Sequence, residues 1–267
     1  MRGMSLNLSR CVDVASRVAK QTGKLLLKHA GSPARVETKR SAVDLVTEID
    51  RAAEHQIRRA LARSFPDFGF LGEEHGASKE GAATRWIIDP IDGTMNFVHG
   101  IPLFGISIGL EHEGKLVAGV IYDPSRGELY TAVRGRGAFL NGRRIHVSKT
   151  RDLSRSLLST GFSANFRKQP EPYLSWFRAF ESSTHAVRRI GTTVLCMAYV
   201  ASGRMEGFYE QDLWPWDIAA GIVIVEEAGG KVTNFDGKRP ALERGRLIAS
   251  NGLIHGAIRK ILQKHPA

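Results

Sequence analysis

The chain has 267 residues, of which 42% are hydrophobic and 24% are charged, and its formal net charge is +11. This length fits one large domain or two small ones, and the composition is that of a folded globular protein rather than a disordered chain. No apolar run approaches the ~20 residues of a membrane span, and the two cysteines, Cys11 and Cys196, do not indicate a disulfide framework, so we expect a cytoplasmic protein without a secretory leader.

The N-terminal half predicts helices packed against an antiparallel sheet. Helical periodicity covers residues 6–29 and 47–65. Shorter apolar runs then predict strands at 68–71, 85–88, 106–110, 116–122 and 128–133. The third and fourth of these strands flank a Gly-containing turn, which is a hairpin signal, and Asn141-Gly142 predicts another tight turn.

The C-terminal half alternates strands with helices, a pattern that is typical of an α/β layer. We expect strands at 157–160, 205–210, 231–234 and 247–250. We expect helices at 173–181, 192–201, 217–228 and 254–264. The change of pattern near residues 145–152 predicts an N-terminal part, 1–148, and a C-terminal part, 149–267.

Positive charge is concentrated in residues 1–40, which hold nine Lys or Arg and two acidic residues, a local charge of +7. Such a segment can attract nucleic acid, anionic lipid or an anionic substrate. The simpler interpretation is a solvated helix face. No aromatic residue interleaves these charges, so a stacking platform for single-stranded nucleic acid is not predicted here.

Two aspartates, Asp89 and Asp92, follow an apolar run in the stretch WIIDPIDGTMNFVHG, residues 86–100. Two carboxylates in a partly dry site are unfavourable unless a cation joins them. Oxygen ligands of this kind favour Mg²⁺, Mn²⁺ or Ca²⁺ over zinc. Pro90 restricts the backbone between them and can aim the Ile91 carbonyl at the same ion.

Gly93 and Thr94 follow directly and are expected to open a short helix, whose backbone N–H groups suit a phosphate. A plain turn explains the same residues, because Asp-Pro and Asp-Gly are common turn pairs and Asp92 can cap that helix. The motif alone leaves both interpretations open.

Acidic residues elsewhere favour the metal site. Glu73 follows the strand at 68–71, and Asp217 begins the helix at 217–228. Taken singly, Glu73 is typical of a surface acid and Asp217 of a helix N-cap. Together with Asp89 and Asp92 they predict a cage of four carboxylates.

Several segments resemble the signature segments of the inositol monophosphatase family: DLVTEID (44–50), LGEE (71–74), WIIDPIDGTMNFVHG (86–100) and WPWDIAAG (214–221). Residues 191–210 resemble the segment before the last metal-binding aspartate of that family. Residues 122–142 and 151–162 are most similar to its bacterial SuhB-type inositol-1-monophosphatases. The likeness runs over roughly residues 8–262.

The resemblance implies a layered αβαβα sandwich of mixed α+β and α/β character. It implies a phosphomonoesterase that uses a metal-activated water to hydrolyse myo-inositol monophosphate to inositol and phosphate. The cofactor would be Mg²⁺, two or three ions per active site, with Mn²⁺ as an alternative ion and Li⁺ as an inhibitor. A homodimer is implied as well. SuhB-like proteins are associated with ribosomal RNA transcription complexes, so contact with RNA or the transcription machinery is an alternative role, in addition to catalysis or instead of it.

Carried over by position, the resemblance implies two metal sites that share one ligand. Glu73, Asp89 and the carbonyl of Ile91 would hold the first ion. Asp89, Asp92 and Asp217 would hold the second, with Asp89 bridging the two.

The resemblance also implies catalytic and substrate-binding residues. Asp50 would pair with the Thr94 hydroxyl to orient the attacking water, so that Asp50, Glu73 and Thr94 are the catalytic residues. The backbone amides of Gly93 and Thr94 would seat the phosphate. The remaining substrate contacts would come from Arg188, Gly191, Thr192, Thr193 and Glu210.

Three features depart from the family pattern. Met95 stands where a second threonine is common, but it follows the phosphate-seating residues. Thr193 stands where alanine is common, which leaves the alcohol open. Fructose-1,6-bisphosphate, histidinol phosphate and a 3′-phosphonucleotide are alternative substrates, although Glu210, seven residues before Asp217, favours a polyol. The segment 163–172 is individual and can set substrate or dimer contacts.

Overall fold

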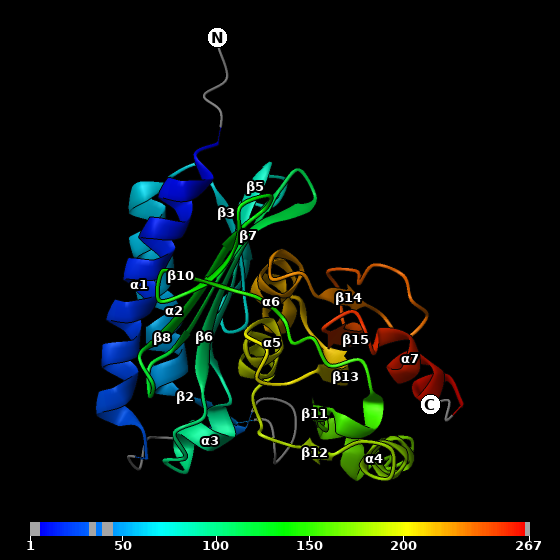
Figure 1. Cartoon of the computed structure of the whole chain (residues 1–267). Coiled ribbons are helices and arrows are strands. Elements are labelled where there is room, and N and C mark those ends of the chain that lie inside the picture. The colour runs from blue at the N-terminus through cyan, green and yellow to red at the C-terminus, as the bar shows by residue number, and fades with distance from the viewer. Residues whose placement is uncertain (1–5, 32–35, 39–44, 265–267) are drawn as a thin grey trace.

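The computed structural model describes residues 6–31, 36–38 and 45–264. Its elements form five layers, which Figure 1 shows edge-on: a pair of helices, a large sheet, a second pair of helices, a smaller sheet and a third pair of helices. The αβαβα sandwich expected from the sequence is therefore confirmed. No helix in the described ranges is both long and apolar enough to cross a membrane.

The first layer consists of α1 (Leu8–His29) and α2 (Glu48–Ser64), close to the helices expected at 6–29 and 47–65. The side chain of Asn7 begins α1 by accepting a hydrogen bond from the backbone nitrogen of Arg10 (3.0 Å). Between the two helices, β1 (Val36–Thr38) and β2 (Leu45–Thr47) form a short antiparallel ribbon. Both helices bury an apolar stripe against the sheet behind them.

The second layer is a sheet with the strand order β10-β9-β8-β7-β6-β5-β3-β4. Its strands are β3 (Gly69–Gly72), β4 (Gly76–Ser78), β5 (Thr84–Asp92), β6 (Gly105–His112), β7 (Lys115–Asp123), β8 (Glu128–Val133), β9 (Gly137–Leu140) and β10 (Arg143–Ile145). The expectation of an antiparallel sheet holds for every described pair except β3 and β5, which are parallel. The chain turns back through β4 on the outer edge of β3 before it crosses to β5, so β5 runs in the direction of β3.

The third layer consists of α5 (Thr193–Ala201) and α6 (Pro215–Glu227), whose residues are buried almost throughout. Helices of this kind are apolar on all sides because sheets cover both faces. Two strand glycines let α6 approach closely: a Cβ on Gly109 would lie 2.8 Å from the Cβ of Ala219, and one on Gly119 would lie 2.5 Å from the carbonyl oxygen of Ala220. This contact fixes the start of α6, and with it Asp217, beside β5 and β6.

The fourth layer is a sheet with the order β12-β11-β13-β15-β14, in which β11 is parallel to β12 and β13 and the other pairs are antiparallel. Its strands are β11 (Leu157–Thr160), β12 (Ala186–Arg188), β13 (Gly207–Leu213), β14 (Lys231–Thr233) and β15 (Gly245–Ser250). The fifth layer consists of α4 (Tyr173–Glu181) and α7 (His255–Lys264). Two 3₁₀ turns, η1 (Leu153–Arg155) and η2 (Ala164–Arg167), flank β11.

Candidate active site

The two carboxylates of the Asp-Pro-Ile-Asp stretch lie within strand β5 rather than after it. The sequence predicted a strand that ends at residue 88, but β5 continues to Asp92. Asp89 is opposite Ser107 and Asp92 is opposite Gly105. Between these pairs, two residues of β5 face one residue of β6, which is a β-bulge. Proline is tolerated there because β3 pairs with β5 only as far as residue 88. The bulge brings both carboxylates to the same end of the sheet.

Asp89 is buried, and its carboxylate accepts a hydrogen bond from the backbone nitrogen of Ile91 (3.0 Å). Burial raises the pKa of Asp89 well above its usual value, and the charges of Glu73, Asp92 and Asp217 raise it further. The pKa of Asp217 is raised in the same way by burial, Asp92 and Glu73. The four acids that the sequence grouped therefore act on one another electrostatically.

Asp217 and Asp92 also hold helix ends. The helix expected from Asp217 begins two residues earlier, at Pro215, and Asp217 accepts a hydrogen bond from the backbone nitrogen of Trp214 (2.7 Å). Asp92 accepts hydrogen bonds from the hydroxyl of Thr192 and the backbone nitrogen of Val194 (2.8 Å). It thus caps α5, a hundred residues further along the chain, and the alternative that Asp92 caps its own short helix is wrong.

The donor set fits a hard divalent cation. All the groups on offer are oxygens, and the mutual repulsion around Asp89 is of the kind that a bound cation offsets. No three acidic, histidine or cysteine side chains of the described residues already converge as a metal cage. Each of the three aspartates instead accepts a backbone N–H. The residues that would hold such an ion are Glu73, Asp89, Ile91, Asp92 and Asp217.

The expected pair of Asp50 and Thr94 is in contact. Asp50 is fully buried on α2, and the Thr94 hydroxyl lies 3.3 Å from its Oδ1 and 3.1 Å from the carbonyl oxygen of Ile91. Thr94 begins the expected short helix, α3 (Thr94–Val98), and Gly93 precedes it with φ 90°. A Cβ on Gly93 would lie 3.0 Å from the carbonyl oxygen of Leu103, so both conformation and space require glycine.

Sequence reasoning missed Glu54, which is fully buried on α2. Its carboxylate accepts hydrogen bonds from the backbone nitrogens of Glu74 (2.7 Å) and His75 (3.3 Å) and from the Arg58 guanidinium (2.9 Å). A Cβ on Gly72 would lie 2.0 Å from Glu54 Oε1. Glu54 therefore holds the turn that carries Glu73. The sequence signal that could have identified Glu54 was the presence of an acidic residue on the apolar face of α2.

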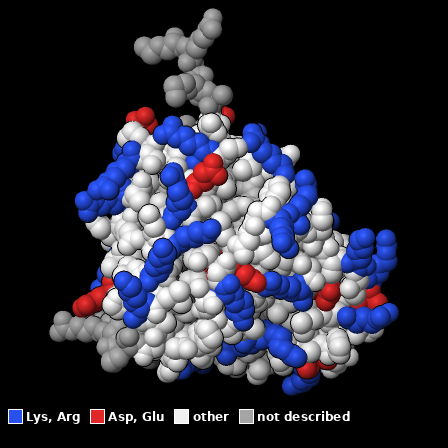
Figure 2. Space-filling model, turned by 60° about the vertical axis from the view of Figure 1, so that its left-hand side comes forward, with Lys and Arg blue, Asp and Glu red and all other residues white. Residues whose placement is uncertain are grey.

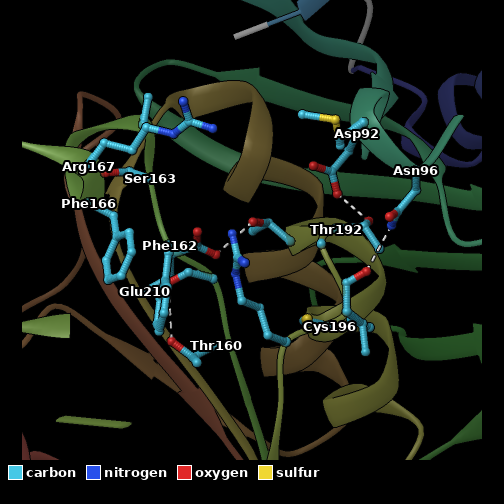
Figure 3. Close-up of a pocket in the computed structure, with 17 residues that line it drawn as sticks. Asp92, Asn96, Thr160, Phe162, Ser163, Phe166, Arg167, Thr192, Cys196 and Glu210 are labelled. Carbon is cyan, nitrogen blue, oxygen red and sulfur yellow. Dashed lines mark hydrogen bonds between the residues drawn. The ribbon is translucent and has the colours of Figure 1, made fainter. Parts of the chain in front are cut away.

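A cavity of about 640 Å³ opens beside the carboxylates, and Gly191, Thr192, Thr193 and Glu210 line it together with Asp92 (Figure 3). The Thr193 hydroxyl donates to Glu210 (3.0 Å), and burial raises the pKa of Glu210 to about 8. Arg188, expected on the alcohol side, is exposed, and its Nη1 donates to the Val187 carbonyl (3.2 Å). It does not line the cavity, whereas the next residue, Arg189, does.

Further cavity residues were not predicted from the sequence. Phe162, Phe166 and Arg167 form a wall opposite Asp92 (Figure 3), and they belong to or adjoin the individual segment 163–172. Asn96 donates from Nδ2 to the carbonyl oxygens of Leu103 and Ile190, both at 2.8 Å, and so joins α3 to the loop before α5. Such contacts between distant segments have no local signal.

Comparison with known proteins identifies relatives over nearly the whole chain. The family model described as the inositol monophosphatase family matches residues 7–267. Nus factor SuhB of Pseudomonas aeruginosa is 42% identical over 95% of this chain and 96% of its own. The inositol-1-monophosphatase of Mesorhizobium japonicum is 41% identical over 96% of this chain and 97% of its own. The solved structure of a Thermotoga maritima IMPase is 39% identical, covers 96% of this chain and 97% of its own, and gives a TM-score of 0.88.

Proposed function

The chain belongs to the inositol monophosphatase family and is an inositol-phosphate phosphatase, and we propose that it uses Mg²⁺ to hydrolyse a myo-inositol monophosphate to inositol and phosphate. The observation that carries this proposal is the grouping of Asp89 with Glu73, Asp92 and Asp217. Carboxylates so grouped would repel a phosphate ester, so catalysis here requires a cation that offsets both charges.

The proposed ligands form two sets that share Asp89. Glu73, Asp89 and the Ile91 carbonyl would hold one ion, and Asp89, Asp92 and Asp217 would hold the other. When bound, the cations supply charge for the phosphate oxygens and lower the pKa of water, so no histidine base or covalent nucleophile is needed.

The remaining residues orient the water and the ester. The Thr94 hydroxyl, which contacts Asp50 and the Ile91 carbonyl, can accept a hydrogen bond from the attacking water and so direct its lone pair. The backbone N–H groups of Gly93 and Thr94 would seat the phosphate. Glu210, whose pKa is about 8, is largely protonated near neutral pH and can both donate to and accept from sugar hydroxyls.

The decisive test is release of inorganic phosphate from inositol-1-phosphate with and without Mg²⁺, for wild type and Asp92→Asn. We expect near-complete loss in the variant, with an unchanged circular dichroism spectrum. Asp236→Asn, an exposed aspartate outside the site, is the matched control and should keep full activity. Substantial phosphate release without metal would refute the mechanism.

The alcohol is tested with a substrate panel. Fructose-1,6-bisphosphate, histidinol phosphate and a 3′-phosphonucleotide are the competing substrates. We expect inositol-1-phosphate to be hydrolysed faster than the histidinol and nucleotide esters, because Glu210 and Thr193 offer polar groups to hydroxyls. If inositol-1-phosphate is the slowest of the panel, the assigned alcohol is wrong. We also propose that Li⁺ inhibits the enzyme and that Mn²⁺ supports its activity. We propose that the protein is a homodimer in solution, which analytical sedimentation would measure.

A second role is favoured by the surface of α1. Arg10, Arg17, Lys20, Lys24 and Lys28 are exposed on this helix. Figure 2, with the α1 side turned forward, shows Lys and Arg side chains spread over that face with few acids among them. The relative from Pseudomonas aeruginosa is a Nus factor. We therefore propose that this face also contacts RNA or the transcription machinery.

This second role is tested by salt-dependent binding to RNA and to transcription factors. Reversing the charge of Lys20, Lys24 and Lys28 should weaken binding and reduce its salt dependence. Reversing Lys149, Arg151 and Arg155, exposed near η1, is the matched control. Equal binding by both triple variants would remove the α1 face from the interaction.

A further inference from the structure

The cavity wall opposite Asp92 comes from a segment that leaves the second sheet. Residues 163–172 connect β11 to α4 and include η2. Figure 3 shows Ser163, Phe166 and Arg167 together on this side of the cavity. The proposed reaction assigns no task to the segment, although it lines the space that the alcohol part of a substrate would enter.

Both ends of this segment meet one carboxylate oxygen of Asp212 on β13. Ser163 precedes η2 as its N-cap, and its hydroxyl donates to Asp212 Oδ2 (2.8 Å). Tyr173 begins α4, and its hydroxyl donates to the same oxygen (3.0 Å). The two hydroxyl oxygens lie 2.6 Å apart. The segment is therefore closed into a loop by Ser163, Tyr173 and Asp212, which are called here the neck.

Aromatic packing joins the neck to the cavity wall. Tyr173 is buried, and its ring packs edge-on against Phe162 (centroids 5.5 Å apart) and Phe166 (5.7 Å). Phe162 and Phe166 are stacked on each other, with centroids 4.7 Å apart. Contacts of this kind fix the relative positions of the rings. A displacement of Tyr173 would therefore also displace Phe166 and the neighbouring Arg167.

Asp212 itself has a backbone conformation that is unfavourable for aspartate. Its φ is 65°, in the left-handed region, and it lies at the bulge of β13 between Gln211 and Leu213. Glycine would adopt this conformation without strain. The side chain gives aspartate its use here, because Oδ2 accepts from two hydroxyls and Oδ1 lies 3.3 Å from the Arg244 guanidinium. Such strain persists where the surrounding contacts hold it.

We propose that Asp212 is a positioning residue, which holds the cavity wall of Phe162, Phe166 and Arg167 in place through the neck and so sets the affinity for the alcohol part of the substrate. Asp212 does not itself line the cavity, so its effect on a substrate passes through the neck. This inference rests on the proposed phosphatase function. Because the wall is opposite Asp92, loss of the neck should weaken substrate binding and leave the chemical step largely unchanged.

The test compares Asp212→Gly with Asp212→Asn in phosphate release from inositol 1-phosphate with Mg²⁺. Glycine removes the carboxylate and relieves the backbone strain, so we expect KM to rise about tenfold with kcat within about twofold of the wild type. In the Asn variant the amide oxygen can replace Oδ2 and accept from both hydroxyls, while the pair with Arg244 is lost. We expect its KM to stay close to that of the wild type.

An unchanged KM in Asp212→Gly, or an equal rise in both variants, overturns the proposal and leaves the phosphatase function intact.

A double-mutant cycle tests whether Asp212 acts through the neck. Tyr173→Phe alone should raise KM severalfold, and Asp212→Gly/Tyr173→Phe should have the KM of Asp212→Gly, because both changes open the same contact. Ser183→Ala is the matched control for loss of a hydroxyl, since Ser183 is exposed after α4 and lies outside the cavity wall. It should keep the wild-type KM. A rise in the double variant that equals the product of the two single effects contradicts the proposal.

Failure of the phosphatase function gives a different result, namely no Mg²⁺-dependent release by the wild type or any variant. Limited digestion with trypsin, followed by mass spectrometry of the fragments, still tests the neck in that case. Arg167 and Lys168 are exposed within the loop. We expect cleavage there to be about tenfold faster in Asp212→Gly than in the wild type or Asp212→Asn, because an opened neck exposes the backbone to the protease. Cleavage at Arg151, exposed outside the loop, is the internal control and should not change. Equal rates at Arg167 and Lys168 in all three proteins would overturn the proposal.

Discussion

Single buried acids in this protein have two different tasks. Burial and the charges of Glu73, Asp92 and Asp217 raise the pKa of Asp89, as expected of a site that binds positive charge. Glu54 is equally buried but spends its oxygens on two backbone N–H groups and one guanidinium. The first task would hold a cation, and the second holds the turn that carries Glu73. The difference lies in the partners and not in the residue type.

Replacing Glu54 by Gln should lower activity without unfolding the chain. An amide has a single acceptor oxygen, so one of the N–H groups of Glu74 and His75 loses its partner and the turn beside Glu73 loosens. We expect kcat to fall about tenfold and the Mg²⁺ concentration for half-maximal activity to rise, at little change in KM, since a charged hydrogen bond is worth roughly 1.5–3 kcal/mol. Glu48→Gln, exposed on the same helix, is the control. An unaltered Mg²⁺ dependence would limit Glu54 to a structural role.

His255 should make stability depend on pH. It is buried between the hydroxyls of Thr233 (2.9 Å) and Ser250 (2.8 Å), and burial, with Lys231 and Arg259 nearby, lowers its pKa to about 4. The unfolded chain, with an ordinary pKa of about 6.5, binds more protons between these values. The free energy of unfolding therefore falls as pH drops from 6.5 towards 4, by about 3 kcal/mol from this residue.

Urea denaturation at pH 7 and pH 4.5 measures this effect. The variant His255→Gln keeps polar atoms near both hydroxyls but does not titrate. We expect the wild type to lose more stability than the variant over this interval. Parallel losses would show that His255 does not contribute to the pH dependence.

At the scale of elements, the site depends on how closely helices approach strands. A Cβ on Gly119 of β7 would lie 2.5 Å from the backbone of α6, and one on Gly109 of β6 would lie 2.8 Å from the Ala219 side chain. Asp92 joins the end of β5 to the first turn of α5 by accepting a hydrogen bond from the backbone of Val194. Asn96 joins α3 to the loop before α5 by donating to the Ile190 carbonyl. The proposed ligands are thus placed by contacts between elements rather than by any one element.

Gly119→Ala tests this placement. Its Cβ would lie 2.5 Å from the Ala220 carbonyl oxygen, so β7 and α6 must separate. We expect a loss of about 1–3 kcal/mol of stability, as for other overpacked cores, and a fall in activity because α6 carries Asp217. Gly256→Ala in α7, where a new Cβ meets nothing within 4 Å, should be neutral or slightly stabilising. Equal urea midpoints for the two variants would contradict the argument.

Helices with a strong local period and the longer apolar strands were predictable, whereas strand ends and contacts that depend on pairing were not. The periodicity of residues 6–29 and 47–65 predicted α1 and α2, because the spacing of apolar residues in an amphipathic helix can be recognised from the sequence alone. The bulge that extends β5 to Asp92 depends on its partner strand β6. Likewise, the choice of Arg189 over Arg188 as a cavity residue depends on where β12 ends. The acids proposed as metal ligands were identified by motif, whereas Glu54 and the cavity wall of Phe162, Phe166 and Arg167 required the fold.

At the scale of the whole molecule, the proposed metal ligands come from residues 73 to 217 and from the first sheet and the central helix layer. Folding places these acids near enough for their charges to raise the pKa of Asp89, which is a cost in like charge around a buried group. Stability and function are therefore opposed at this point in the fold. The rest of the core, which is apolar on both sides of α5 and α6, offsets the cost.

This opposition predicts how metal removal changes thermal stability. With saturating Mg²⁺ at a hundred times its dissociation constant, the wild type should gain about 2.7 kcal/mol from binding to the folded state alone. Chelation with EDTA should abolish that gain and all Mg²⁺-dependent phosphate release. Asp89→Asn removes one buried charge while its side-chain oxygen can still accept from Ile91. We expect this variant to melt at a higher temperature than the wild type in EDTA, to show little shift on adding Mg²⁺, and to be inactive. Asp236→Asn should follow the wild type in both conditions. A variant that melts lower than the wild type in EDTA would show that Asp89 stabilises the fold by itself, and the charge repulsion argued for this site would then be wrong.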